Sequence, residues 1–307
     1  MSDEPTLRRR DFLKSTPLVL GGIGVMAQTG FSTEPTISEE AGGSGGVTVQ
    51  EVIDRIMADA GVEPIEDTID TLKTGAPTHP VNGIVTTFMA TSAVIQQAIE
   101  HKANFIITHE PTFYSHRDTT DWLENDHVYK HKRALLDAHG ITVWRYHDHI
   151  HKIKPDPIFT ALISRLGWLD KIDPNDPRIC HIPPMKLSDI AQHCKQRLGV
   201  DALRYVGHPD MPCTNIGLLP GAPGGAMQIG LLSEGNIDVI ICGEVNEWET
   251  NEYVRDSQHT DKPLGLIVTG HQSSEEDGMK TLADWLAKQY PDIPVQHLPA
   301  GDPFTHI

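Results

Sequence analysis

The sequence predicts an α/β fold with two related β-α-β lobes, mostly parallel sheets, and a metal site between the lobes at the carboxyl ends of strands. Three observations lead to this prediction. Short apolar runs alternate along the chain with segments of helical spacing. The stretches 82–110 and 215–244 share one order of strand, loop, helix and strand. His and carboxylate residues directly follow three of the apolar runs.

Six apolar runs have the length and composition of buried strands. They are residues 83–88, 104–108, 141–146, 215–219, 238–242 and 264–269. The segments between them have helix-compatible spacing, at 92–102, 130–139, 187–198, 227–233, 250–256 and 279–289. Strands that alternate with helices indicate parallel β-α-β units. We expect lobe one at 47–154, a bridging segment with prolines at both ends at 155–211, and lobe two at 212–307.

The first 30 residues predict a twin-arginine export signal. Arg9 and Arg10 are followed by Asp-Phe-Leu-Lys, and the apolar stretch 17–27 then has the length of a signal-peptide core and is too short to span a membrane. Residues 31–46, rich in Ser, Thr, Glu and Gly, are expected to form a disordered linker. The protein is therefore expected in the periplasm or outside the cell.

Composition excludes several classes of partner. The chain of 307 residues carries 25 basic against 42 acidic residues, a formal charge of −17, which disfavours nucleic acids and anionic membranes. No other apolar run approaches the ~20 residues of a membrane span, so stable membrane insertion is not expected. The four Cys form no C-x-x-C pair, and whether any of them form disulfides is left open.

Residues that bind metals follow three predicted strands. His109 and Glu110 follow 104–108, the run from His147 to His151 follows 141–146, and His271 and Glu275 follow 264–269. Ligands bind beyond the carboxyl ends of parallel strands, so clusters far apart in sequence can converge. Imidazole together with carboxylate suits Zn, Mn, Fe, Co or Ni. The number of candidates exceeds what one tetrahedral zinc needs, which predicts two divalent transition-metal ions.

These motifs resemble those of the NIF-three-like dinuclear metal-centre family, also called GTP cyclohydrolase I type-two-like. The resemblance covers residues 48–305. The stretches that carry it are GIVTTFMATSAVIQQAIEHKANFIITHEPTFY, LSDIAQHCKQRLGVDALRYVG, GNIDVIICGEVNEWE, GHQSSEEDGMKTLADWL and the terminal DPF.

The resemblance implies a set of metal ligands: His109, Glu110, His151, His271 and Glu275. The family pattern Thr-His-His-Pro corresponds here to residues 108–111, His-x-x-x-Asp to 147–151, and Gly-His-x-x-x-Glu to 270–275. One His of the pattern is Glu110 here and one Asp is His151, so the set still holds three His and two carboxylates. We expect an altered metal preference. The competing interpretation is that Asp148 or His149 takes the place of His151.

Two functions fit these residues. The first is a metal-dependent hydrolase that acts on a small molecule, with Glu275 as a bridging carboxylate and Asp148 or Glu244 as general base. The alternative is a non-catalytic metal-binding scaffold or regulatory protein, because no motif defines a substrate. The Gly-rich loop 221–225 is either an anion cradle or, more simply, a tight strand-to-helix turn. The sequence 247–249 departs from the family pattern, and the resemblance also implies a homo-oligomer, a hexamer.

Overall fold

The computed structural model describes residues 46–234 and 236–307. The predicted export signal at 1–30, and the predicted linker at 31–46 except its last residue, lie outside the described residues. Within the described part of the chain, no helix is both long enough and apolar enough to cross a membrane.

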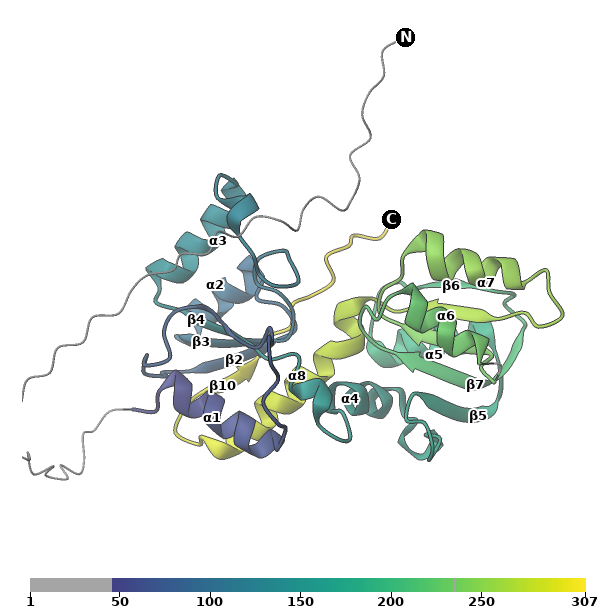
Figure 1. Cartoon of the computed structure of the whole chain (residues 1–307), viewed down its shortest axis with the longest axis horizontal. Coiled ribbons are helices and arrows are strands. Elements are labelled where there is room, and N and C mark those ends of the chain that lie inside the picture. The colour runs from purple at the N-terminus through teal and green to yellow at the C-terminus, as the bar shows by residue number, and fades with distance from the viewer. Residues whose placement is uncertain (1–45, 235) are drawn as a thin grey trace, which may run out of the picture. The chain divides into compact units, whose positions relative to one another are not determined.

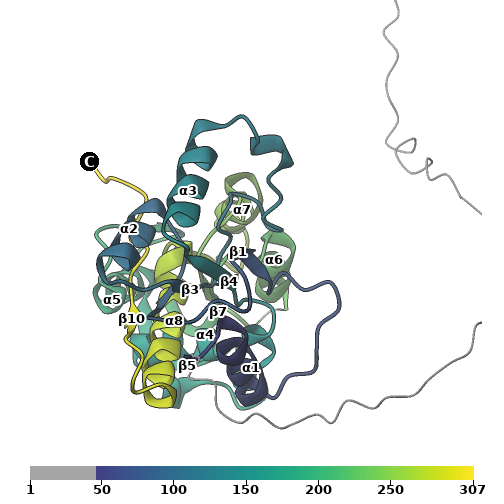
Figure 2. The same ribbon diagram turned by 90° about the vertical axis from the view of Figure 1, so that its left-hand side faces the viewer.

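The first sheet has five strands in the order β1-β4-β3-β2-β10 (Figures 1 and 2). β10, β2, β3 and β4 run parallel to their neighbours, and β1 pairs with β4 in the antiparallel sense. Figure 2 shows α2 and α3 on one side of this sheet and α1 and α8 on the other. The bounds are β1 Leu72–Thr74, β2 Ile84–Thr87, β3 Phe105–Thr108, β4 Thr142–Arg145, β10 Val295–His297, α1 Val49–Ala60, α2 Ser92–Glu100, α3 His127–Ala138 and α8 His271–Gln289.

The second sheet has the order β5-β7-β8-β9-β6. Its three central strands are parallel and both edge strands are antiparallel. α4 and α5 pack on one face and α6 and α7 on the other. The bounds are β5 Ile179–Lys186, β6 Arg204–Val206, β7 Pro212–Leu219, β8 Val239–Cys242, β9 Gly265–Val268, α4 Pro157–Leu166, α5 Leu187–Leu198, α6 Gly225–Ser233 and α7 Glu252–Ser257. Short helices lie at η1 Asp121–Leu123, η2 Ile150–Lys152, η3 Leu169–Lys171 and, as a π-helix, η4 Glu247–Asn251.

The structure confirms the α/β class and the mostly parallel sheets. All six predicted strands are present as β2, β3, β4, β7, β8 and β9. The stretches 82–110 and 215–244 form the equivalent units β2-α2-β3 and β7-α6-β8. Each central strand is buried along its whole length or its carboxyl-terminal half, which explains the continuous apolar runs in the sequence.

The chain crosses between the two sheets more often than the predicted lobe boundaries imply. The segment expected to bridge, 155–211, supplies β5 and β6, the two edge strands of the second sheet. α8 begins at the end of β9 and packs against α4, β2 and β10, and β10 then joins the first sheet. α8 runs between the two sheets in Figure 1. One continuous helix therefore connects the end of a strand in the second sheet to the core of the first.

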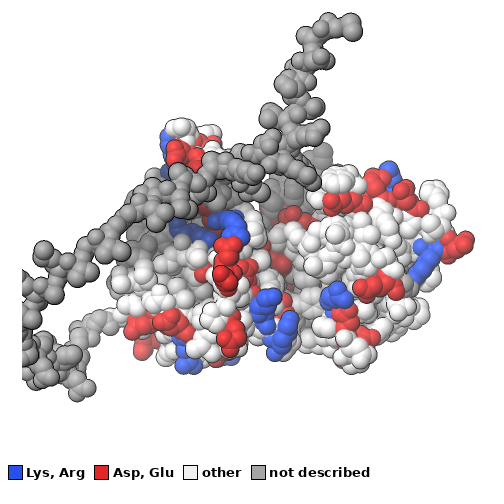
Figure 3. All heavy atoms as spheres, in the orientation of Figure 1, with Lys and Arg blue, Asp and Glu red and all other residues white. Residues whose placement is uncertain are grey.

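Side chains of both charges lie on the surface. Figure 3 shows Asp and Glu side chains scattered over the face seen there, with Lys and Arg side chains in smaller groups beside them.

The interior holds the four cysteines, all buried and all free thiols. The question that the sequence left open is thus answered, since no cysteine of this structure forms a disulfide.

Candidate metal centre

The carboxyl ends of three parallel strands supply the residues of the centre. His109 and Glu110 directly follow β3, and a loop after β4 carries His147 and His151. His271 is the first residue of α8, which begins after β9, and Glu275 lies one turn further along. The structure brings all five predicted ligand residues together, and it adds His147.

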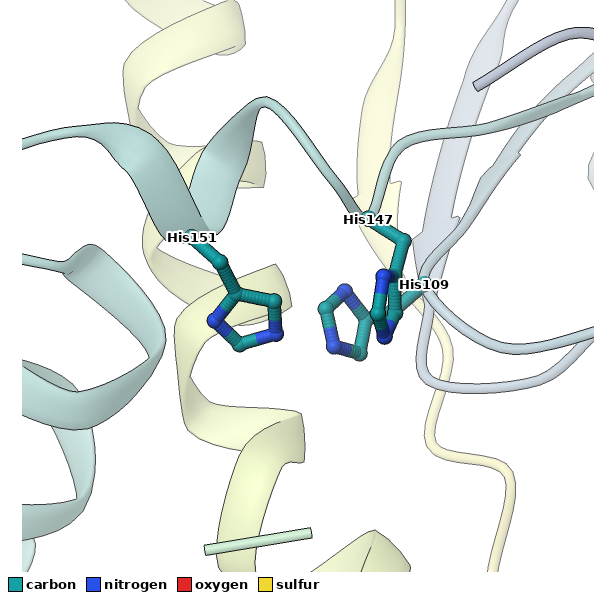
Figure 4. Close-up of side chains that lie close together, drawn as sticks. All are labelled: His109, His147 and His151. Carbon is teal, nitrogen blue, oxygen red and sulfur yellow. The ribbon is translucent and has the colours of Figure 1, made fainter. Parts of the chain in front are cut away.

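Three imidazoles form one donor group. One ring nitrogen each of His109, His147 and His151 lies within 4.8 Å of the other two. Figure 4 shows the three rings close together, with His151 coming from the short helix η2. The rings of His109 and His147 stack with their centroids 4.7 Å apart, and the ring of His151 meets both edge-on at 5.0 and 4.9 Å.

Two carboxylates and a further imidazole form the neighbouring donor group. Oxygens of Glu110 and Glu275 lie within 4.8 Å of each other and of a His109 nitrogen. His271 Nε2 is 3.4 Å from Glu110 Oε1 and 3.0 Å from Glu275 Oε2. Glu275 Oε2 is also 3.4 Å from His109 Nε2, and Glu110 Oε1 is 3.5 Å from His147 Nε2. Both carboxylates therefore lie between the three imidazoles and His271.

Each of the four imidazoles has its Nδ1 bonded to an acceptor outside the cluster. His109 Nδ1 donates to the Tyr146 carbonyl (3.2 Å). The Nδ1 atoms of the other three imidazoles contact carboxylates. His147 contacts Asp148 at 3.1 Å, His151 contacts Asp156 at 2.8 Å, and His271 contacts Glu244 at 3.1 Å. These acceptors cannot donate, so Nδ1 carries a proton and Nε2 is the nitrogen that faces the cluster. This is the tautomer that binds a metal through Nε2.

The donor set fits a metal ion. Four donors at the ~2.0–2.1 Å typical of zinc ligands lie about 3.3 Å from one another in a tetrahedron, close to the nitrogen–oxygen separations found here. His109 Nε2 and Glu275 Oε2 are buried and make no hydrogen bond. Buried polar atoms without partners are costly, and a cation between them would satisfy both.

The Gly-rich loop closes tightly against the second donor group. A Cβ at Gly221 would lie 2.1 Å from Glu275 Oε1 and 3.3 Å from His271 Nε2, and its φ of +67° also requires glycine. The Gly221 amide donates to Ser274 Oγ (3.0 Å), and its carbonyl accepts from the Glu244 amide (2.8 Å). The loop therefore acts here as a tight turn that holds the start of α8 in place.

Arg145 lies directly behind Glu110. It is the last residue of β4, is completely buried, and donates to Glu110 Oε2 at 3.0 Å. Its other donors bind the carbonyls of His109 and His116. Sequence reasoning missed this residue, although a charged residue within the apolar run 141–146 was a signal that could have found it.

The loop after β4 is anchored by Asp70. This carboxylate, 1% exposed, accepts the backbone amides of His147 (2.7 Å), Asp148 (2.8 Å) and His149 (2.9 Å). It also bonds His149 Nδ1 at 2.8 Å, while His149 Nε2 accepts the Ile65 amide. Both ring nitrogens of His149 are thus engaged away from the cluster, which argues against its replacing His151.

The two predicted general bases lie behind the imidazoles. Asp148 accepts from Thr68 Oγ1 and the Ile69 amide and contacts His147, whereas Glu244 contacts His271 and has a side chain 60% exposed. Although burial by itself raises their pKa, hydrogen bonds to Ile69 and His147 lower the pKa of Asp148 to about 2. The hydrogen bond to His271 likewise lowers the pKa of Glu244.

Opposite charges determine the ionisation of the centre itself. Burial raises the pKa of Glu275, but the imidazoles of His109 and His271 outweigh it and bring this pKa to about 2. The pKa of Glu110 is lowered in the same way by His147 and His271. Burial lowers the pKa of His271, yet the three carboxylates around it raise that pKa overall. Glu110 and Glu275 are therefore both anionic at neutral pH.

Comparison with known proteins places the chain in a family. Residues 47–301 match the sequence profile of the family described as Duf34/NIF3 (NGG1p interacting factor 3). The chain belongs to the DUF34/NIF3 family. Relatives that it resembles include two proteins named GTP cyclohydrolase 1 type 2 homolog. The one from Haemophilus influenzae is 27% identical over 219 residues, 68% of this chain and 81% of the relative. The one from Pseudomonas aeruginosa is 25% identical over 231 residues, 71% and 82% of the two chains.

Solved structures of the DUF34/NIF3 fold also match. Staphylococcus aureus protein SA1388 superposes with a TM-score of 0.67 at 18% identity, over 85% of this chain and 99% of that protein. A Bacillus cereus protein related to NIF3 gives 0.67 at 16% identity, over 86% and 100%. These likenesses show a shared fold.

Proposed function

We propose that this chain holds two divalent transition-metal ions and uses them to hydrolyse a small molecule. His109, His147 and His151 would hold one ion, and Glu110, Glu275 and His271 the other. The observation that carries the proposal is the common orientation of the imidazoles, each with Nδ1 bonded outward and Nε2 left for a metal.

Charge supports two ions rather than one. Five carboxylates are ligands or contact a ligand imidazole, namely Glu110, Glu275, Asp148, Asp156 and Glu244. One guanidinium, that of Arg145, contacts this set. The net charge of −4 equals in magnitude the charge of two dications, and the two buried carboxylates of the set, Glu110 and Glu275, need such compensation most.

The chemistry that bound divalent ions supply is Lewis acidity, which lowers the pKa of water and polarises a substrate oxygen. The chain's own residues do the rest. Asp148, Asp156 and Glu244 hold the imidazoles in position. The exposed part of the Glu244 side chain lies next to His271, where it could accept a proton from a water molecule entering from solvent. The name of the relatives, GTP cyclohydrolase 1 type 2 homolog, is consistent with the proposed hydrolase function.

The test is metal analysis of the purified protein, followed by turnover assays on phosphoesters, nucleotides and cyclic amides. The wild type should hold up to two ions per chain, and His109→Ala should lose at least one. His131→Ala is the matched control, because that histidine is exposed on α3. A wild type that stays metal-free after incubation with Zn, Mn and Fe would end the proposal. Metal binding without any turnover would favour the scaffold function instead.

Two further proposals concern the whole protein. We propose export by the twin-arginine route, supported by the motif at residues 8–14. Replacing Arg9 and Arg10 with Lys should leave the precursor in the cytoplasm, and unchanged secretion would overturn this.

We also propose self-association as a hexamer, supported by the resemblance to the family. Light scattering of the purified protein measures its mass directly, and a monomer would contradict it.

A further inference from the structure

We propose that the two positions of this centre differ in metal preference and that Arg145 is the positioning residue that maintains the difference. The inference rests on the proposed two-ion centre. The first position offers three nitrogen donors. The second offers two carboxylate oxygens and one nitrogen. The protein would accordingly hold two different divalent ions, a nitrogen-preferring one such as Zn²⁺ and an oxygen-preferring one such as Mn²⁺.

The first position is built from three imidazoles, with Glu275 Oε2 3.4 Å from His109 Nε2 and Glu110 Oε1 3.5 Å from His147 Nε2 at its boundary with the second position. His109, His147 and His151 converge within 4.8 Å, and each Nδ1 is fixed by a carbonyl or a carboxylate. Imidazole donors suit Zn, Cu, Fe and Ni, whereas Mn²⁺ binds weakly to such sites. Mn²⁺ therefore has little affinity for the first position.

The second position is anionic. Glu110 Oε1 and Glu275 Oε2 lie 3.4 and 3.0 Å from His271 Nε2, and both side chains are at least nine-tenths buried. Carboxylate oxygens suit Mn²⁺ and Mg²⁺. Burial strengthens the attraction between these two anions and a cation, because little water competes for it.

Arg145 determines which oxygen of Glu110 faces the centre. Its Nη2 holds Glu110 Oε2 at 3.0 Å, so Oε1 is the atom left beside His271 and His147. The guanidinium is itself held by the carbonyls of His109 and His116 and is completely buried. A planar group with three fixed acceptors has little freedom, so the carboxylate that it binds keeps one orientation.

The experiment loads metal-free protein with one equivalent of Zn²⁺ and then titrates Mn²⁺. Bound Zn is measured by elemental analysis and bound Mn²⁺ by loss of its free electron-paramagnetic-resonance signal. The wild type should keep one Zn and bind one Mn²⁺. Glu110→Gln should retain Zn and bind Mn²⁺ at least about tenfold more weakly, whereas His151→Ala should lose Zn affinity and keep the Mn²⁺ position.

Arg145→Gln should weaken Mn²⁺ binding by about 10–100-fold with Zn affinity unchanged, as expected when an outer partner of a ligand is removed. Arg133→Gln is the control, an arginine on α3 paired with Asp137. If circular dichroism shows that Arg145→Gln does not fold, Arg145→Lys replaces it. The lysine keeps the charge but lacks the planar guanidinium with its fixed donors, so Mn²⁺ affinity should still fall. A Mn²⁺ affinity equal to that of the wild type would remove Arg145 from the proposal.

Failure of this inference differs from failure of the proposed function. A wild type that binds no ion overturns both. A wild type that binds two Zn²⁺ with equal affinity, or excludes Mn²⁺ once one Zn²⁺ is bound, overturns only the asymmetry. Equal loss of both ions in Glu110→Gln and in His151→Ala would overturn it as well.

Discussion

Gly221 lies so close to the candidate metal centre that there is no room for a larger residue at its position. Its Cα faces Glu275 so closely that even a methyl group would overlap the carboxylate. The neighbouring Gly243 is constrained in turn, because its Cβ would lie 2.6 Å from the Gly221 carbonyl oxygen. Two glycines from different loops thus allow the start of α8 to approach the ends of β7 and β8.

Gly221→Ala should displace Glu275 and weaken the second metal position. The new Cβ would lie 2.1 Å from Glu275 Oε1, and alanine at φ +67° costs about 1–2 kcal/mol. We expect loss of one ion by elemental analysis and a matching drop in the free energy of unfolding in urea. Gly230→Ala is the control, since nothing lies within 4 Å of its Cβ and alanine in a helix adds about 0.5–1 kcal/mol. Full metal content in Gly221→Ala would contradict the assignment.

The four thiols should be unreactive in the folded protein. Burial raises the pKa of Cys194, Cys213 and Cys242 to about 12 and that of Cys180 to about 11. Because the thiolate is the nucleophile, alkylation by iodoacetamide at pH 8 should be very slow and should speed up only as pH approaches these values. Intact-mass measurement checks this, with guanidinium-unfolded protein as the control in which all four react. Rapid labelling of native protein would show that a cysteine is accessible.

At the level of single residues, sequence reasoning identified the candidate donors that directly follow a strand. It was less successful with donors in the loop after β4. His109, Glu110, His271 and Glu275 lie at strand ends or on the first helical turn after one, where spacing alone indicates direction. His147 went unrecognised as a donor because three histidines in five residues cannot be told apart without the backbone. The anchor at Asp70, far away in sequence, decides which of them face the cluster.

Among the elements, α4 has a direct connection to the centre through its N-cap. Asp156 Oδ1 accepts the amides of Ile158 and Phe159, which caps the helix. Its Oδ2 bonds His151 Nδ1 at 2.8 Å. One carboxylate thus starts a helix and fixes the tautomer of a proposed metal ligand.

Asp156→Asn should separate these two roles. The amide oxygen can still cap α4, so the free energy of unfolding of metal-free protein should change little. The amide nitrogen can only donate, which moves the His151 proton to Nε2 and should lower Zn affinity by about 10–100-fold in calorimetry. Asp126→Asn, which caps α3, is the control and should leave Zn affinity unchanged. Asp156→Ala should additionally cost about 1 kcal/mol of stability. Wild-type Zn affinity in Asp156→Asn would refute the link.

The strands that sequence reasoning found have a continuous apolar run, and the strands that it missed lie at the edges of the sheets. β5 contains Pro183 and Pro184 and changes register between His181 and Met185, so it shows no strand periodicity. β1, β6 and β10 have three residues each. α1 was missed although Thr48 and Glu51 form a capping box. α8 was predicted from residue 279, because the polar start that carries the ligands lacks an apolar face.

At the scale of the whole described molecule, the centre joins the two sheets. His109, Glu110 and His147 follow strands of the first sheet, whereas His271 and Glu275 follow β9 of the second. An ion bound to Glu110, His271 and Glu275 would hold the two sheets together. Binding to the folded state alone stabilises it in proportion to the logarithm of the ion concentration.

Removal of metal should therefore lower the melting temperature of the whole protein. At a free Zn²⁺ concentration about 1,000 times the dissociation constant, the stabilisation is about 4 kcal/mol. We expect a lower melting temperature in EDTA, restored by excess Zn²⁺, in differential scanning calorimetry. His131→Ala should show the full shift and His109→Ala a reduced one. A melting temperature indifferent to EDTA would mean that no bound ion stabilises the folded protein.

The position of α8 late in the chain has a consequence for synthesis. The three imidazoles of the first position are all synthesised by residue 151, whereas His271 and Glu275 follow only with the last helix. β10, which completes the first sheet, comes later still. A chain that stops before α8 lacks both donors from the second sheet, and its first sheet lacks an edge strand and one of the two helices that cover one face. A centre with both donor groups thus exists only in chains translated nearly to their end.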